Sequence, residues 1–193
     1  MELLNATCNA RIVAALRLLL VAMAACLPAL ATTHARAQTP PVEYAVKATY
    51  LYKFAPFVEW PAGTLEPSDP LVICVVGSDP VADLVDEAVK GQAVLGHPIE
   101  VMHLPASFAD ARCHILYVAL RGAAATRALE RVRGKPVLTV TDAADKVRAT
   151  GIVNFVVHDN RVRFAIDLRA AADNHLVISS KLLNLASRVS PKP

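Results

Sequence analysis

The spacing of apolar and polar positions predicts a chain in which short strands alternate with helices. Between residues 71 and 148, short runs of aliphatic and β-branched residues are separated by segments whose apolar positions recur at helical spacing. This alternation is typical of parallel strands joined by helical crossovers. The expected strands cover 71–76, 98–103, 114–119 and 136–140, and the expected helices cover 80–90, 122–132 and 142–148.

After residue 150 the pattern changes to two strands joined by a short polar turn. Residues 151–157 and 161–167 flank the turn 158–160, which predicts an antiparallel hairpin. In the second strand every other residue is apolar, so one hairpin face is expected to be buried and the other polar. A last helix is expected over 181–189. The predicted fold is therefore a three-layer α/β domain: a mostly parallel sheet flanked by helices, with a C-terminal antiparallel hairpin and a final helix.

A further helix is expected over residues 42–58, ahead of the first strand. Its apolar residues recur at intervals of four and three, at Val42, Val46, Tyr50, Phe54 and Phe57. This stripe is expected to lie on the sheet. Residues 42–61 hold six of the ten aromatic residues of the chain. The main interpretation is a core helix, and the alternative is a partly exposed aromatic face that serves dimerisation or partner docking.

The first 37 residues have the pattern of a signal peptide. Arg11 and Arg17 precede an uncharged run over 18–30, which is shorter than the roughly 20 residues of a spanning helix. Ala35-Arg36-Ala37 then fits a small-x-small cleavage site, so we expect an exported domain over 38–193. One alternative is a lipoprotein in which Cys26 is acylated and becomes the first residue. Another is that the segment is a buried amphipathic helix.

Charge and length argue for a single domain that does not bind nucleic acid. Removal of residues 1–37 takes away three basic and one acidic residue and leaves 17 basic against 16 acidic residues. Basic residues do not cluster among aromatic ones, so the electrostatic pattern of DNA- or RNA-binding proteins is missing. The remaining length suffices for one hydrophobic core, and the sequence shows no second apolar stretch long enough to cross a membrane.

Two cysteines remain after cleavage, Cys74 and Cys113. Cys74 lies within one expected strand and Cys113 directly precedes another, so neighbouring strands would bring them together. In an oxidising compartment they would form a disulfide. The alternative is two separate buried thiols that pack as small apolar groups. A metal site at Cys113 and His114 is not expected, because adjacent strand residues point to opposite faces.

Polar residues at two strand ends are the main candidates for binding chemistry. Gly77-Ser78-Asp79 and Thr141-Asp142 follow strands at the edge where open α/β sheets bind ligands. Their first interpretation is helix capping, and a ligand crevice is the alternative. No nucleophile elbow, phosphate loop or zinc-binding helix motif occurs, and the histidines are scattered. We therefore predict no catalytic residue, no metal site and no cofactor.

Six blocks of the sequence resemble, in order, the YfiR family. They are Phe57-Val58-Glu59-Trp60-Pro61, Leu71-Val72-Ile73-Cys74, Cys113-His114-Ile115-Leu116-Tyr117-Val118, Val137-Leu138-Thr139-Val140-Thr141-Asp142, Arg161-Val162-Arg163-Phe164-Ala165-Ile166-Asp167-Leu168 and Ser179-Ser180-Lys181-Leu182-Leu183-Asn184-Leu185-Ala186. The resemblance covers essentially the whole mature chain. It implies a periplasmic, non-enzymatic regulator that binds the periplasmic sensor region of an inner-membrane diguanylate cyclase and represses it.

By the same resemblance, Cys74 and Cys113 match the cysteines of the family's intradomain disulfide, which would make repression sensitive to redox stress. Two departures stand out. Thr150-Gly151 replaces the paired glycines that often open the family's hairpin, and a further cysteine pair of some members is missing. Members of the family also occur beside other sensors and outer-membrane receptors, so the partner is a cyclase or a related sensor.

Two other classes of function compete with the repressor. One is a small-ligand-binding module that uses the crevice at 77–79 and 141–142 and reports to another receptor. The other is a hydrolase that uses Ser78 or Asp142. For a repressor, the expected contact surface is the hairpin together with the final helix, at Phe155, Phe164, Ile166, Leu182 and Leu185, and a homodimer is a further expectation.

Overall fold

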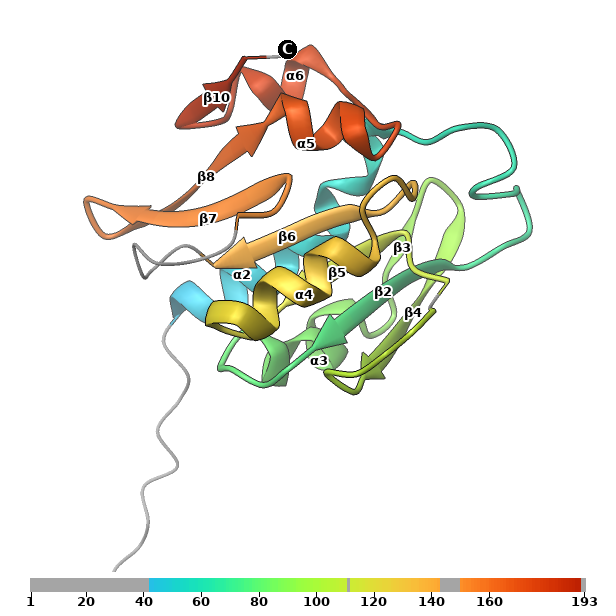
Figure 1. The fold of residues 1–193 in the computed structure, drawn as a ribbon, viewed down its shortest axis with the longest axis horizontal. Coiled ribbons are helices and arrows are strands. Elements are labelled where there is room, and N and C mark those ends of the chain that lie inside the picture. Colours follow the sequence, from blue (N-terminus) through green and yellow to red (C-terminus); the bar gives the residue numbers. More distant parts are fainter. Residues whose placement is uncertain (1–41, 111, 143–149, 192–193) are drawn as a thin grey trace, which may run out of the picture. The chain divides into compact units, whose positions relative to one another are not determined.

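An eight-stranded sheet organises the fold (Figure 1). The computed structural model describes residues 42–110, 112–142 and 150–191. The predicted signal peptide and Cys26 lie outside these residues, as does the predicted helix 142–148 beyond Asp142, which ends a strand. The sheet has the order β10-β8-β7-β6-β5-β2-β4-β3. Its strands are β2 (Leu71–Val76), β3 (Ala93–Val94), β4 (His97–Leu104), β5 (Ile115–Val118), β6 (Leu138–Asp142), β7 (Val153–His158), β8 (Arg161–Asp167) and β10 (Arg188–Ser190).

Parallel pairing dominates this sheet. β4, β2, β5, β6 and β7 are successive parallel neighbours, and β10 runs parallel to β8. The antiparallel pairs are β7 with β8, which is the predicted hairpin, and β3 with β4. A separate antiparallel pair joins β1 (Val58–Glu59) to β9 (Val177–Ile178). The predicted mostly parallel sheet with a C-terminal hairpin is therefore confirmed.

Helices lie on both faces of the sheet and complete three layers (Figure 1). On one face α2 (Val42–Lys53), η3 (Ala82–Leu84) and α3 (Val85–Val89) cover Leu71, Ile73 and Val75 of β2. On the other face α4 (Gly122–Arg131) covers the alternate β2 residues Val72, Cys74 and Val76. β2 is thus apolar on both sides because it is buried on both sides, as expected of a central parallel strand. The remaining helices are η2 (Ala55–Phe57), α5 (Leu168–Asp173) and α6 (Ser180–Leu183).

The first helix turns a different face to the core from the one predicted. Its buried residues are Lys47, Ala48, Leu51 and Tyr52, whereas Val42 is 78% exposed. Of the predicted stripe only Phe54, which follows the helix, is fully buried, and Val46, Tyr50 and Phe57 are partly exposed. The physical reason is that Lys47 has carboxylate partners inside the protein, so this charged side chain takes a core position.

The predicted final helix over 181–189 is also corrected. α6 ends at Leu183, and residues 188–190 form β10 at the edge of the sheet. Ser187 causes the change of direction, since both its backbone N–H and its hydroxyl donate to the carbonyl of Phe164 on β8. Helix α5 was not predicted. It begins directly after β8 because the carboxylate of Asp167 accepts from the backbone N–H groups of Arg169 and Ala170.

Candidate functional site

The edge where the parallel strands end holds the first half of the predicted crevice. Gly77 has φ +88°, and a Cβ there would lie 2.8 Å from a methyl group of Leu120, so only glycine fits this turn. The Asp79 carboxylate accepts from the N–H groups of Val81 at 2.9 Å and Ala82 at 2.8 Å. Its other oxygen accepts from the Tyr117 hydroxyl at 2.7 Å. Asp79 therefore caps the turn into η3, while Ser78 is exposed.

The second half of the predicted crevice is tied into the sheet in the same way. The Thr141 hydroxyl donates to the side-chain oxygen of Asn154 at 2.7 Å. The Lys47 ammonium donates to Asp142 at 2.7 Å and to Glu43 at 2.5 Å. Lys47 is fully buried. Burial lowers the pKa of Lys47, but the hydrogen bonds and charges of Asp142 and Glu43 outweigh it, so this pKa lies above its ordinary value.

The structure does not bring the two halves of this crevice together. Val118 of β5 is the register partner of both Val76 and Thr141, so β5 separates β2 from β6. Two strand spacings put the halves roughly 10 Å apart. Leu120 lies against Gly77 between them. Asp79 therefore acts as a cap, in agreement with the first interpretation of 77–79. Thr141 and Asp142 form internal hydrogen bonds instead, and the helix that they were expected to cap lies outside the described residues.

The sequence did not reveal that Lys47 is buried and paired with Asp142. Its spacing from Glu43 is that of an ordinary surface pair on a helix. Its second partner, Asp142, lies 95 positions further along the chain, and nothing local connects the two. The lysine itself was no clear sign of a buried partner, because Glu43, Thr49 and Lys53 make the helix polar at other positions as well.

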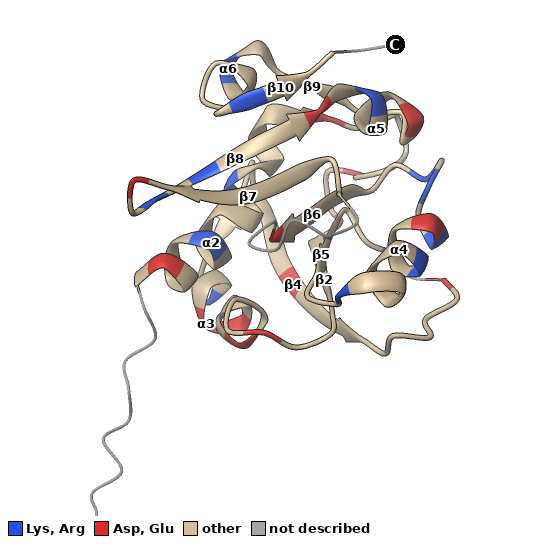
Figure 2. Cartoon of the chain, turned by 60° about the vertical axis from the view of Figure 1, so that its left-hand side comes forward, with Lys and Arg blue, Asp and Glu red and all other residues tan. Residues whose placement is uncertain are grey.

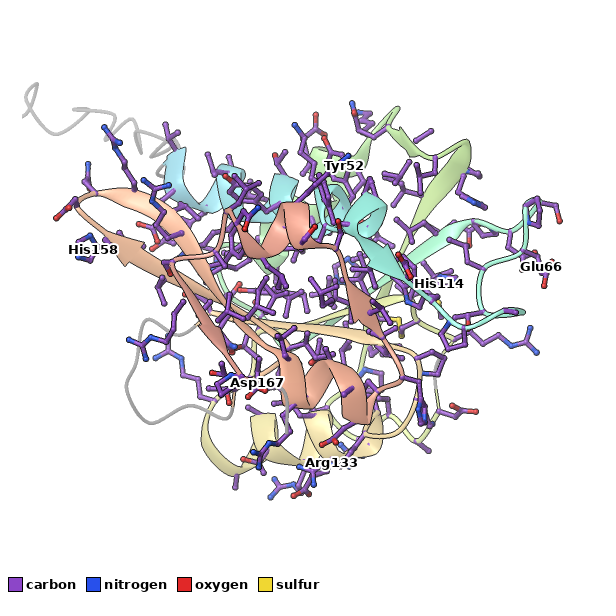
Figure 3. All side chains as sticks on the ribbon, turned by 90° about the horizontal axis from the view of Figure 1, so that it is seen from above. Tyr52, Glu66, His114, Arg133, His158 and Asp167 are labelled. Atoms are coloured by element: carbon purple, nitrogen blue, oxygen red, sulfur yellow. A yellow bond between two sulfur atoms is a disulfide. The ribbon has the colours of Figure 1, made fainter. Side chains whose placement is uncertain are left out.

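Cys74 and Cys113 form the predicted disulfide. Their Cα atoms are 5.7 Å apart, and both side chains are buried in the core beneath α4. The next residue, His114, lies close to this bond (Figure 3). His114 accepts from the N–H of Val72 through Nδ1 at 2.9 Å, and its Nε2 lies 2.9 Å from the carbonyl of Thr64. Both ring nitrogens are thus used to fasten β2 and a loop to β5, which is a structural role.

The predicted contact residues are mostly unavailable at the surface. Phe155, Phe164, Ile166 and Leu182 belong to the core, and the prediction that they form a contact surface is corrected for that reason. Phe164 packs on Phe54 with ring centroids 5.2 Å apart, and Tyr50 lies 6.1 Å from the same ring. These aromatics fasten α2 to the hairpin. Leu185 is different, since its side chain is 62% exposed.

Two open surfaces flank the hairpin instead. A groove of about 490 Å³ lies between the first turns of α2 and the hairpin tip, where Val42, Val46, Val157 and Val162 make it largely apolar. A second groove, of about 600 Å³, lies on the opposite hairpin face and runs to β10. Arg163 and Arg188 line the second groove. Exposed surface in this region therefore lies in these two grooves and not at the buried residues that were predicted as contacts.

Neither metal ligation nor membrane insertion is indicated within the part of the chain that the structure describes. In that part, no group of three His, Cys, Asp or Glu side chains could hold a metal ion. Each helix there is too short or too polar to span a bilayer.

Comparison with known proteins assigns the chain to a family. A search of curated proteins finds no match. The model of the YfiR/HmsC-like family, however, matches residues 44–187, which is well over half of the chain. The match runs from α2 through the disulfide and the hairpin to the residue that precedes β10. The protein therefore belongs to the YfiR/HmsC-like family.

Proposed function

We propose that this protein is a periplasmic, non-enzymatic regulator that binds the periplasmic region of an inner-membrane diguanylate cyclase and represses it. The observation that carries the proposal is the family match over residues 44–187. Repression would hold cyclic di-GMP low in the cell until the complex weakens. Residues 1–37 would serve as the signal peptide that delivers the protein to the periplasm.

The disulfide and the sheet edge support this proposal. A buried Cys74–Cys113 bond suits a protein that folds in an oxidising compartment. At the edge where α/β enzymes place their ligands, the carboxylates of Asp79 and Asp142 are held by internal donors. These two carboxylates are therefore already engaged within the protein, which favours the regulator over the ligand-binding and hydrolase alternatives at this edge.

Deletion and complementation test the proposal. Cells that lack the gene should contain more cyclic di-GMP, and the full chain should restore the low level. A matched control is the same chain without residues 1–37, which should stay in the cytoplasm and fail to restore it. In parallel, crosslinking of the tagged full chain in cells, followed by mass spectrometry, should recover a diguanylate cyclase with a periplasmic domain. Unchanged cyclic di-GMP together with capture of a different receptor would contradict the proposal.

A further inference from the structure

The hairpin has one face that packs on α2 and one that no helix in the described part of the chain covers. Strand register identifies the residues of the open face. Val156 lies opposite Arg163, and Asn154 lies opposite Ala165, so these side chains point to the same side. The parallel partner of Ala165 on β10 is Arg188, which adds a third strand to this face.

A groove of about 600 Å³ follows this face across the three strands. Its floor contains the half-buried side chains of Val156 and Ala165. Arg163 and Arg188 rise from neighbouring strands, and both are exposed. Figure 2 shows Lys and Arg positions on β8 and β10, and Figure 3 shows His158 and Asp167 toward the two ends of β8. The groove is therefore a basic surface with an apolar floor.

Within the described part of the chain, no acidic side chain pairs with the arginines of this groove. Neither Arg163 nor Arg188 has a carboxylate partner among residues 42–110, 112–142 and 150–191. Among the described residues that line the groove, the one carboxylate is that of Asp167, and it is engaged at the N-terminus of α5. Asp159, at the hairpin tip, lies 3.0 Å from His158 and is not among the residues that line the groove.

Two guanidinium groups on adjacent strands favour a ligand that carries two carboxylates. A guanidinium donates in a planar fork that matches a carboxylate, and such charge-assisted pairs are stronger than neutral hydrogen bonds. The apolar floor between the arginines suits a small apolar side chain. The groove also reaches β10, the edge strand of the sheet. This combination of charge, floor and open edge fits a segment of another protein.

We propose that the groove formed by β7, β8 and β10 is the surface by which this protein binds its cyclase. Its occupant is an acidic segment of the cyclase's periplasmic domain, with carboxylates on Arg163 and Arg188 and an apolar side chain on Val156 and Ala165. This inference rests on the proposed function and names the surface that would carry it out. The contacts are the exposed arginines on the open face of the hairpin, in place of the buried phenylalanines on its covered face.

Binding of the purified mature protein to the purified periplasmic domain of the cyclase tests the groove. Arg163→Glu with Arg188→Glu should weaken binding roughly a hundredfold, because loss of one charge-assisted contact costs about a factor of ten. The matched control is Arg127→Glu, at an exposed arginine on α4, which should bind as the unchanged protein does. Higher salt should weaken binding of the unchanged protein more than that of the double variant. Thermal unfolding should show that all three proteins are folded.

The outcomes separate this inference from the proposed function. If the unchanged protein binds the cyclase domain and the double variant binds equally well, the groove is not the contact surface, while the proposed function stands. If the unchanged protein does not bind at all, the proposed function fails and the groove assignment fails with it. If the double variant loses binding to the cyclase domain and to an unrelated acidic protein to the same extent, the surface binds acidic proteins non-specifically. The assignment to the cyclase is then overturned.

Discussion

The centre of the sheet and the end that carries β10 differ in how their faces are covered. At the centre, formed by β2, β5 and β6, α2 and α3 lie on one face and α4 on the other, and a disulfide adds a covalent link. At the end formed by β7, β8 and β10, the described helices cover a single face, and the other face holds a basic groove. The comparison suggests a division of labour, in which the centre supplies stability and the end carries the surface proposed for binding.

The largest expected effect tests whether the covered face of the hairpin is structural. Phe164→Ala should lower the free energy of unfolding by roughly 3–5 kcal/mol, because the ring is buried against Phe54 and Tyr50. Chemical denaturation measures this change. A variant that keeps full stability but no longer binds its partner would place the contact surface back on Phe164.

Removal of the disulfide should destabilise the centre of the sheet. Cys74→Ala with Cys113→Ala should cost roughly 2–4 kcal/mol, since the bond closes a loop across 39 positions. Denaturation of the unchanged protein with and without a reducing agent provides the control, and its reduced form should approach the stability of the variant. Equal stability of the oxidised and reduced forms would show that the disulfide does not stabilise the fold.

The buried ion pair of Lys47 and Asp142 provides a third test of stability. Asp142→Asn should cost about 2 kcal/mol, because Lys47 then keeps only Glu43 as a carboxylate partner. Lys47→Met should cost less, because it removes the buried charge itself. The two variants are compared by denaturation at neutral pH, and the idea fails if Lys47→Met is the more damaging one.

The ion pair of Lys47 and Asp142 should also make the stability of the protein fall at alkaline pH. The folded-state pKa of Lys47 is raised, so its contribution to stability is fully present below the ordinary lysine pKa of about 10.4 and is lost as pH rises through the folded-state value. Above that ordinary value, the unchanged protein should lose stability faster than Lys47→Met. Parallel pH profiles of the two proteins would show that Lys47 does not contribute in this way.

The smallest expected effect concerns the open face of the hairpin. Arg163→Glu should change the free energy of unfolding by no more than about 0.5 kcal/mol, because the side chain is exposed and has no carboxylate partner in the described part of the chain. Arg127→Glu on α4 is the matched exposed substitution. A loss of stability at Arg163 well above that at Arg127 would mean that the open face also serves the fold.

A strand or helix could be predicted where a regular pattern of buried residues runs along that one element. Residues 71–76 form β2 as predicted, because an unbroken apolar run records burial on both faces. The prediction failed where a distant partner decides the outcome. Asp142 allows Lys47 to face the core, and the carbonyl of Phe164 diverts Ser187 out of a helical path. The pattern also read Asp167 as the end of a strand, although its carboxylate begins α5 as well.

The candidate surface was less predictable than the fold, for a related reason. Alternation along β8 showed which residues face the core and which face away, and Arg163 was on the outward set. The sequence could not show that β10 would place Arg188 on the same face, because β10 overlaps the end of the helix predicted over 181–189. The sequence therefore favoured apolar residues of the hairpin as contacts, although they belong to the core.

The pairing of β1 with β9 bears on how the chain acquires its structure. Val58 meets Ile178 about 120 positions further along the sequence. Contacts between such distant positions form late, because the entropy of closing a long loop must be overcome first. A chain that is made from its amino terminus cannot form this pair until nearly all of it has been synthesised. The β1–β9 pair therefore completes the fold only when almost the whole domain is present.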